Sequence, residues 1–227
     1  MKRVLLTGGT GLLGSALTRE LCANGCSVLA VYRANHARAQ ALRRETGCDI
    51  ACADCSREDD VAALFQNQRF DAVVHLAGWS QNALAVQTSP ALWQAVVESH
   101  LTSAFLLCRA GLQQLPRGGQ LLLVSSRVGL VGNAGQSAYA AVKAGMLGLM
   151  RAAALEGRAR DVRVNAICPG YAPHAGEELS ARARERRSEE EILTQNDALE
   201  SFATFVRHVL CSNSNSSGAL WRPDCRI

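Results

Sequence analysis

Residues 3–14, RVLLTGGTGLLG, join an apolar run to a glycine-rich turn and to the start of a helical pattern. In such a segment Gly8 permits the tight turn, Gly11 lets the backbone approach a pyrophosphate, and Gly14 lets the helix pack closely on the strand. The helix N-terminus then faces the anion. A glycine triplet between a first strand and a first helix is typical of a dinucleotide-binding unit. The segment therefore predicts both a βαβ start and a phosphate site.

Further apolar runs and helical patterns alternate along the rest of the chain. The apolar runs lie at 27–32, 49–54, 71–78, 120–126 and 162–170, and the helical patterns at 12–25, 57–68, 91–112 and 138–157. Gly25 and Gly157 lie where helices are expected to stop. Strands that are apolar throughout, each followed by a helix, indicate a parallel sheet covered on both faces. We predict a single α/β domain over 1–227, a Rossmann-type doubly wound parallel sheet.

Two segments break this alternation. Residues 171–195 are charged and helix-like, and the polar residues 211–218 predict a surface loop before a last short strand at 219–224.

Length, charge and hydropathy exclude several classes of protein. The 227 residues carry a net charge of only +4, and the arginines are scattered, so we expect no nucleic-acid partner. No apolar run approaches the roughly 18 residues of a membrane span, and the start MKRVLL lacks the apolar core of a signal peptide. We therefore expect a cytoplasmic protein without a membrane partner.

The chain has nine cysteines, an odd number that favours reduced thiols over a disulfide framework. Cys48, Cys52 and Cys55 have a spacing that also occurs in iron–sulfur proteins. A strand would point Cys48 and Cys52 to one face but gives Cys55 no reason to converge on them. We therefore expect three small buried residues and no metal.

The end of the second predicted strand bears on the cofactor. Enzymes selective for NAD usually place an acidic residue there, which holds the ribose 2′-hydroxyl. This chain has Tyr32 and Arg33 instead, followed by Arg38. Because a guanidinium suits a 2′-phosphate, we predict NADPH in preference to NADH. The alternative is that Arg33 is a surface residue of an arginine-rich chain. Asp54, at the tip of the third strand, could reach the adenine ring.

Lys143 is conspicuous because Lys2 is the only other lysine among 24 basic residues. It follows Tyr139 by four residues, so the two share a helix face. A nearby ammonium is expected to lower the pKa of a tyrosine, which makes the phenol a better acid–base catalyst at neutral pH. Ser125 and Ser126 end a predicted strand, where ligands bind in open α/β sheets. A serine there could hold a carbonyl oxygen while Tyr139 protonates it.

Together the glycine turn, the Ser126–Tyr139 spacing, the Tyr-x-x-x-Lys pair and VNAICPG at 164–170 resemble the short-chain dehydrogenase/reductases. Residues 125–170 are similar to the 3-oxoacyl-[acyl-carrier-protein] reductases of that family. The resemblance implies that Ser126 orients the ketone, that Tyr139 donates the proton, and that Lys143 binds the nicotinamide ribose and lowers the tyrosine pKa. The implied cofactor contacts are Gly8, Thr10, Gly11, Leu13, Gly14, Arg33, Asp54, Cys55, Ala77, Gly78, Tyr139, Lys143, Pro169, Gly170 and Ala172.

The chain departs from the family pattern at three histidines. His100 stands at the fourth catalytic position, where an asparagine holds a water that links the lysine to solvent. A neutral imidazole could do the same work; the alternative is a packed histidine and a slow enzyme. His75, in place of another asparagine, is expected to be a satisfied core residue. His174 replaces a threonine beside the nicotinamide, so the substrate lid at about 171–200 is the region to which the roles of family residues transfer least well.

The resemblance also implies partners. Arg117 and Arg160 match arginines that dock an acidic acyl carrier protein, although both could be solvated surface charges. A homotetramer or dimer through the helices of His100 and Tyr139 is expected. We therefore predict an NADPH-dependent reductase of a 3-oxoacyl thioester, carried by acyl carrier protein. The alternatives are a reductase of a free small ketone, sugar or steroid, and a non-catalytic NADP(H)-binding subunit.

Overall fold

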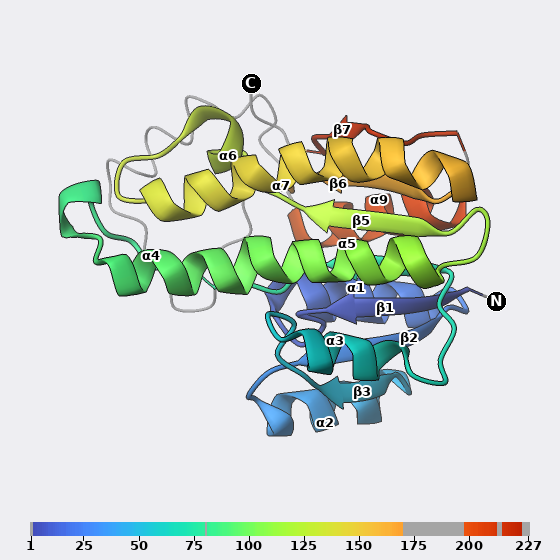
Figure 1. The fold of residues 1–227 in the computed structure, drawn as a ribbon. Helices are drawn as coiled ribbons and strands as arrows, with labels where there is room; N and C mark the ends of the chain where they lie inside the picture. Colours follow the sequence, from blue (N-terminus) through green and yellow to red (C-terminus); the bar gives the residue numbers. More distant parts are fainter. Residues whose placement is uncertain (1, 80, 170–197, 213–214, 224–227) are drawn as a thin grey trace.

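The computed structural model of the chain describes residues 2–79, 81–169, 198–212 and 215–223. Its centre is a seven-stranded sheet in the order β3-β2-β1-β4-β5-β6-β7, with every neighbouring pair parallel (Figure 1). The strands are β1 (Arg3–Thr7), β2 (Ser27–Tyr32), β3 (Asp49–Cys52), β4 (Ala72–His75), β5 (Gln120–Val124), β6 (Arg163–Ile167) and β7 (Leu220–Trp221). The predicted doubly wound parallel sheet is confirmed.

Helices cover both faces of the sheet (Figure 1). One layer consists of α1 (Leu12–Ala23), α2 (His36–Thr46) and α9 (Ala198–Cys211), and the other of α3 (Glu58–Phe65), α5 (Ser103–Gln114) and α7 (Ser137–Glu156). The strand residues alternate between these layers: Leu5 packs in the core with α5 and α7, whereas Val4 and Leu6 pack in the core with α1 and α9. Each face of the sheet therefore has its own hydrophobic core.

The helical pattern at 91–112 is divided into three consecutive segments. Ser89 caps α4 (Pro90–Val97), with Pro90 in the first turn; a π-helical turn, η2 (Glu98–Thr102), follows and leads directly into α5. Such turns are rare and often occur at functional sites. This turn contains His100, so the irregularity lies at the residue that departs from the family pattern.

Three short helices complete the described part of the chain. They are η1 (Ala85–Gln87), α6 (Val128–Val131) and η3 (Gly157–Arg160). The predicted lid at 171–200 lies outside the described residues except for 198–200, which begin α9.

The strand order reverses between β1 and β4. From β1 the chain proceeds to β2 and β3 on one side, and it then crosses to β4 on the other side. Ligands of such sheets bind where the order reverses, outside the carboxyl ends of the strands. The glycine turn follows β1 and Ala77 follows β4, so both lie at this reversal.

The cysteines correct one expectation. Cys48 and Cys55 are buried as predicted, but Cys52 is exposed because it ends the edge strand β3, where its Sγ donates to the Arg33 carbonyl at 3.4 Å. Within the described ranges, no group of three or more potential ligands is placed to hold a metal ion. None of the described helices is both long and apolar enough to cross a membrane.

Candidate active site

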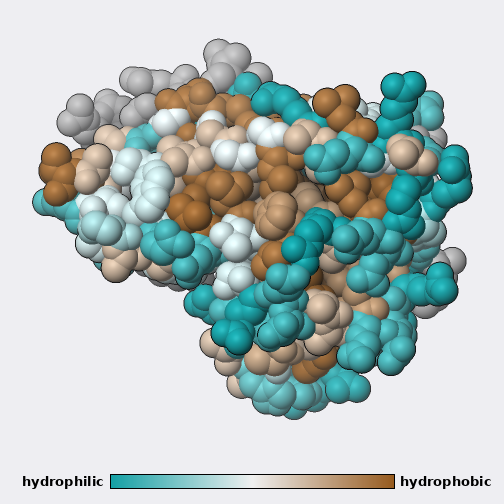
Figure 2. All heavy atoms as spheres, in the orientation of Figure 1, coloured by the Kyte–Doolittle hydropathy of each residue, from teal (hydrophilic) through white to brown (hydrophobic). Residues whose placement is uncertain are grey.

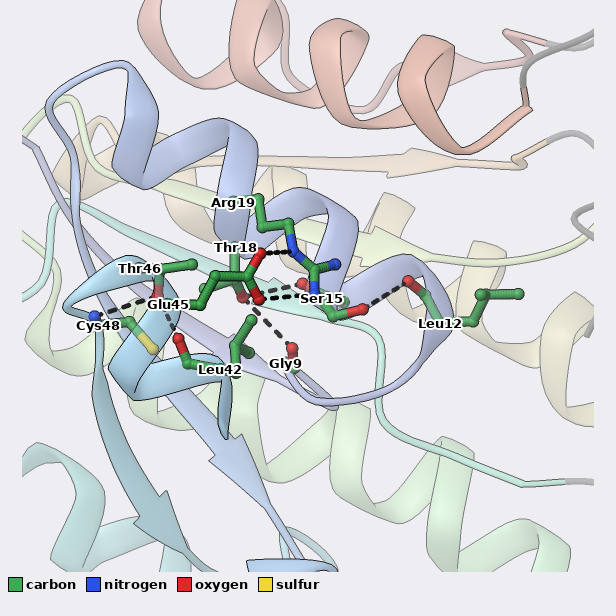
Figure 3. A network of polar contacts seen from close by, with 10 residues as sticks. Gly9, Leu12, Ser15, Thr18, Arg19, Leu42, Glu45, Thr46 and Cys48 are labelled. Atoms are coloured by element: carbon green, nitrogen blue, oxygen red, sulfur yellow. Dashed lines mark hydrogen bonds and ion pairs between the residues drawn. The ribbon is translucent and has the colours of Figure 1, made fainter. Parts of the chain in front are cut away.

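The glycine turn is tied to α1 through Thr18, and further side-chain bonds lie within the first turns of that helix. Thr18 Oγ1 donates to the carbonyl oxygens of Gly14 at 2.9 Å and Gly9 at 3.3 Å, and Ser15 Oγ donates to Leu12 O at 3.1 Å (Figure 3). A Cβ atom at Gly14 would overlap the Gly8 carbonyl, so the missing side chain allows the helix to pack closely on the turn. Gly8 has φ +68°, as expected for a tight turn.

The turn also fits an anionic ligand. Helix α1 starts after Gly11 without a side-chain cap and without an acidic residue in its first turn. Its first amide groups therefore carry the partial positive charge of a helix N-terminus with no carboxylate to compete for it. Thr10 is buried beside the turn and Leu13 is half-buried at the helix start. This arrangement can hold the pyrophosphate of a dinucleotide.

Residues predicted for the adenosine end gather at the tips of β2 and β3. Arg33 is exposed directly after β2. The Asp54 carboxylate accepts from Ser56 Oγ at 2.7 Å; this bond, together with the nearby Arg33 and Arg57, lowers the Asp54 pKa despite partial burial. Cys55 is buried, which raises the pKa of its thiol to about 12. Arg33 and Asp54 thus stand together at the edge where a ribose would lie.

Ser126, Tyr139 and Lys143 come together at the carboxyl end of β5. Ser126 follows this strand and makes a side-chain hydrogen bond with Tyr139 of α7. The Nζ of Lys143 lies 5.5 Å from the centre of the Tyr139 ring and donates to the Val124 carbonyl at 2.8 Å. Lys143 is only 4% exposed. The three predicted residues therefore form one cluster.

Ser125 has a different role from Ser126. It is buried, and its Oγ donates to the main-chain carbonyl of Lys143 at 2.7 Å. Both serines are candidates on sequence grounds, but only Ser126 lies beside the tyrosine. Ser125 instead fixes the helix turn that carries the lysine.

The expected effect of Lys143 on the tyrosine is not observed. Burial raises the pKa of Tyr139 above its usual value, and the Ser126 hydrogen bond only partly offsets this. The lysine is itself buried, which lowers its pKa to about 8. Its ammonium is directed at the Val124 carbonyl, so desolvation of the phenol outweighs the charge. Tyr139 is thus a protonated donor at neutral pH rather than a partial phenolate.

His100 lies next to this cluster. It is 3% exposed, and the centres of its ring and the Tyr139 ring are 5.3 Å apart in an edge-to-face arrangement. Ala77 is half-buried and Gly78 is exposed at the end of β4, where Gly78 lies against the His100 ring. His75 is fully buried, with hydrogen-bond partners at both ring nitrogens, which confirms a satisfied core histidine.

The predicted nicotinamide end is described only in part. Pro169 is half-buried two residues beyond the end of β6, after the buried Cys168. Gly170, Ala172 and His174 lie outside the described residues.

The two predicted docking arginines lie at the opposite edge of the sheet from Ser126. Arg117 precedes β5 and is exposed. Arg160 precedes β6, and its guanidinium donates to the Leu112 carbonyl at 2.5 Å and to the Leu115 carbonyl at 3.2 Å. Arg160 therefore already satisfies carbonyls at the C-terminus of α5.

Three polar groups near the site are not evident from the sequence pattern. Thr7 Oγ1 is hydrogen-bonded to His75, Ser103 Oγ at the start of α5 lies 3.2 Å from His75 Nε2, and the Trp79 carbonyl is hydrogen-bonded to His100. Thr7 directly precedes the glycine turn, so its position in the sequence could have identified it as a residue near the site. The partner of His100 is a main-chain carbonyl, which cannot be predicted from the residue type because every residue has one.

Known proteins are similar to this chain over most of its length. Residues 11–217 match the family model described as Enoyl-(Acyl carrier protein) reductase. A 3-oxoacyl-[acyl-carrier-protein] reductase FabG of Chlamydia trachomatis is 33% identical over 182 residues, 75% of this chain and 73% of that protein. An acetoacetyl-CoA reductase of Rhizobium meliloti is 35% identical over 211 residues, 86% of this chain and 83% of that protein.

Solved structures share the fold at lower identity. A short chain dehydrogenase from Burkholderia cenocepacia J2315, in complex with NADP, superposes with a TM-score of 0.90 at 24% identity, covering 99% of this chain and 97% of that chain. The match to the family and the similarity to the two reductases extend over the Ser126, Tyr139 and Lys143 cluster. The chain therefore belongs to the short-chain dehydrogenase/reductase family.

Proposed function

We propose that the chain is an NADPH-dependent ketoreductase that converts a 3-oxoacyl thioester into the 3-hydroxyacyl thioester. The observation that carries the proposal is the Ser126–Tyr139 hydrogen bond beside the buried Lys143. The similar FabG and acetoacetyl-CoA reductase are both named as reductases of such thioesters.

The cluster can bind a ketone and protonate it. The bound nicotinamide would supply the hydride. Ser126 acts on Tyr139 through a side-chain hydrogen bond, so a carbonyl oxygen bound between the two hydroxyls could accept hydrogen bonds from both. As negative charge develops on that oxygen, Tyr139 transfers its phenolic proton to it. The Lys143 ammonium stands near the ring and can restore the proton. The raised pKa of Tyr139 suits this direction because the phenol stays protonated.

The residues present fit NADPH. The uncapped start of α1 and the positive φ of Gly8 suit the pyrophosphate. At the end of β2 the exposed Arg33 occupies the place where an acidic residue would favour NAD. The Burkholderia structure named above contains NADP. Arg33, rather than a carboxylate, would then hold the 2′-phosphate.

Acyl carrier protein is the proposed carrier, and coenzyme A is the second candidate. The FabG relative supports the first and the acetoacetyl-CoA reductase supports the second. Arg117 is exposed and can meet an acidic partner. Arg160 binds the carbonyl of Leu112 in α5 and that of Leu115, which directly follows the helix. Its guanidinium would therefore have to keep these two bonds while it contacts a carrier.

The test follows NADPH oxidation with an acetoacetyl group on acyl carrier protein and on coenzyme A. Faster turnover of the carrier-bound substrate supports docking if Arg117→Glu lowers that rate and leaves the rate with the coenzyme A substrate unchanged. Arg160→Lys is the matched second variant, because it keeps the positive charge but replaces the planar guanidinium with an ammonium. Tyr139→Phe should reduce turnover at least 100-fold while NADPH still binds. Turnover that survives Tyr139→Phe would overturn the mechanism, and NADPH binding without any turnover would favour a non-catalytic subunit.

A further inference from the structure

Two thiols from distant parts of the chain meet at the amino edge of the sheet. Cys26 directly precedes β2, and Cys211 is the last residue of α9. Both thiols are free, and their Sγ atoms lie 4.0 Å apart although 185 residues separate them in the sequence. A disulfide bond of about 2.05 Å needs the sulfur atoms to approach by roughly 2 Å. Rotation of the two side chains about their Cα–Cβ bonds can supply this approach.

The backbone on both sides of the pair is held by other hydrogen bonds. The Leu210 carbonyl, next to the thiol at the end of α9, accepts from the Lys2 ammonium and, at 2.9 Å, from Gln120 Nε2. The main-chain nitrogen of Cys26 donates to the Leu21 carbonyl at the end of α1, at 3.0 Å. The fold itself therefore keeps the two thiols together.

The two thiols differ in their access to solvent. Cys211 is exposed, whereas Cys26 is buried. Burial raises the pKa of the Cys26 thiol to about 11; Cys211 adds to this effect, and the charge of Lys2 opposes it. A buried, protonated thiol is a poor first target for an oxidant, and an exposed thiol is a better one. Cys211 is therefore the thiol that reacts first, with Cys26 placed to react with its product.

We propose that Cys26 and Cys211 are a redox-sensitive pair that forms a reversible disulfide on exposure to a peroxide and so fastens α9 to the start of β2. The pair lies at the opposite edge of the sheet from Ser126, which follows the carboxyl end of β5. The inference therefore does not depend on the proposed function.

The chemistry takes two steps with hydrogen peroxide as the oxidant. The Cys211 sulfur attacks one peroxide oxygen, the O–O bond breaks, and a sulfenic acid forms while the other oxygen leaves with the thiol proton as water. The Cys26 sulfur then attacks the Cys211 sulfur. The S–S bond forms, the S–O bond breaks, and hydroxide leaves with the Cys26 proton as a second water. Two thiols are oxidised to one disulfide and one peroxide is reduced to two waters; a dithiol reverses the change.

The bond would stabilise the helix that it reaches. Helix α9 contributes Phe202 and Val206 to the core between α1 and the sheet. A cross-link between residues that are 185 positions apart restricts the unfolded chain strongly. Oxidation should therefore make the fold more resistant to heat, while the candidate active site at the other edge keeps its geometry.

The first experiment locates the bond. The full chain is treated with hydrogen peroxide, the remaining thiols are alkylated, and tryptic peptides are analysed by mass spectrometry without reduction. Trypsin leaves Cys26 on peptide 20–33 together with Cys22, and Cys211 on peptide 208–226 together with Cys225. The double variant Cys22→Ser, Cys225→Ser therefore allows only one pairing of these peptides.

The expected result is that the two peptides are joined within one chain, in the wild type and in the double variant, and that dithiothreitol separates them. Alkylation of both thiols after peroxide treatment would overturn the proposal. So would a bond that joins Cys211 to a second copy of the chain, which a non-reducing gel reveals.

The second experiment compares thermal denaturation of the oxidised and the reduced protein. Oxidation should raise Tm by at least ~4 °C in the wild type. Cys211→Ser changes an exposed residue and should abolish the rise without altering Tm of the reduced protein. Cys22→Ser is the matched control, because Cys22 also lies close enough to act on Cys26 but is not part of the proposed bond, so the rise should remain. Equal Tm values for the two redox states of the wild type would overturn the stabilising role.

The outcomes are independent of the catalytic proposal. If the wild type reduces no thioester, the proposed function fails, but the cross-linked peptides and the rise in Tm still decide the fate of the thiol pair. If it is an active reductase, kcat should be the same in the oxidised and the reduced protein, and a loss of kcat that Cys211→Ser prevents would contradict a bond confined to the amino edge. Cys26→Ala, which keeps a small apolar side chain, is the variant for the buried position.

Discussion

In the proposed reaction, the burial of one lysine would set the pH range. Lys143 has its pKa lowered from 10.5 to about 8 by desolvation, and the groups that face it are Tyr139, His75, His100 and the Cys168 thiol. Both histidines are neutral at this pH, so the ammonium is the group that changes charge. The proton supply for Tyr139 is complete below pH 8 and is lost as the pH rises above it.

We therefore expect kcat for ketone reduction to be flat up to about pH 8 and to fall about tenfold per pH unit above it. Initial rates at saturating NADPH and thioester measure this. Lys143→Arg supplies the control, because a guanidinium stays protonated: its lower activity should show no limb near pH 8. A wild-type profile that is flat to pH 10 would contradict the assignment of the proton source.

The two buried histidines also affect stability. Both have pKa values near 3 in the folded state, against an ordinary histidine value of 6.5 in the unfolded chain. Between these values the unfolded chain binds more protons than the folded one, so the free energy of unfolding falls as the pH falls below about 6.5. The loss is roughly 1.4 kcal/mol per pH unit for each histidine.

Urea unfolding between pH 5 and 7, at constant protein concentration, tests this. The wild type should lose stability over that range, and His75→Asn should lose it with about half the slope, whatever its stability at pH 7. An equal slope in the two proteins would mean that other groups dominate the acid transition.

At the scale of elements, the glycine turn joins β1, α1 and the end of β4. A Cβ atom at Gly8 would lie 2.9 Å from the Ala77 main-chain nitrogen, so the turn and the β4 segment approach at van der Waals limits. Gly25, after α1, has a similar φ of +78°, but a Cβ atom there would meet nothing within 4 Å. A comparison of alanine substitutions at the two glycines therefore distinguishes the cost of the positive φ, which both share, from the cost of a steric clash, which only Gly8 would have.

Gly8→Ala and Gly25→Ala should each lose about 1 kcal/mol of stability from the positive φ. Gly8→Ala should lose a further ~1–3 kcal/mol and bind NADPH at least tenfold more weakly, because the displaced turn no longer follows the pyrophosphate. Thermal denaturation and fluorescence titration with NADPH measure both quantities. Equal NADPH affinity in the two variants would place the pyrophosphate elsewhere.

The sequence predicts these elements well where the signal is local. The strands and the glycine turn follow from apolar runs and from glycines at fixed spacing. Helix α9 is not among the predicted elements, although its buried residues Phe202, Val206 and Leu210 recur at the four-residue spacing of one helix face and pack on α1 and the sheet. The pairing of His75 with the His100 carbonyl spans 25 residues and uses a main-chain atom, so no residue pattern could reveal it.

Lys2 illustrates the same limit. In the sequence it is conspicuous only as the second lysine, but its ammonium donates to the Leu210 carbonyl at the end of α9, which buried Gln120 also binds at 2.9 Å. A positive charge at a helix C-terminus is stabilising. The two lysines therefore have separate roles. Lys143 lies at the candidate active site, and Lys2 binds the end of a helix that lies 208 residues further along the chain.

At the scale of the whole molecule, one face remains unusually apolar. Figure 2 shows hydrophobic residues over α4, α5 and α7, the helices that carry or adjoin His100 and Tyr139. Trp93 is 43% exposed, Phe105 48% and Leu155 78%. Large exposed apolar side chains clustered on one face are typical of protein–protein contacts. This supports the proposed homodimer or tetramer through these helices, whose two-fold symmetry would bring each face onto a copy of itself.

Phe105→Arg tests this assembly with little risk to the fold, because the side chain is half exposed on α5. Two charges facing one another across a two-fold axis are repulsive and poorly solvated, so we expect dissociation to monomers by analytical ultracentrifugation at micromolar concentration. Arg44→Ala is the control, since Arg44 is exposed on α2 in the other helix layer and its loss should leave the mass unchanged. Because α5 continues from the π-helical turn of His100, loss of assembly should also reduce kcat more than it raises KM. An oligomer that survives Phe105→Arg would place the interface on another surface.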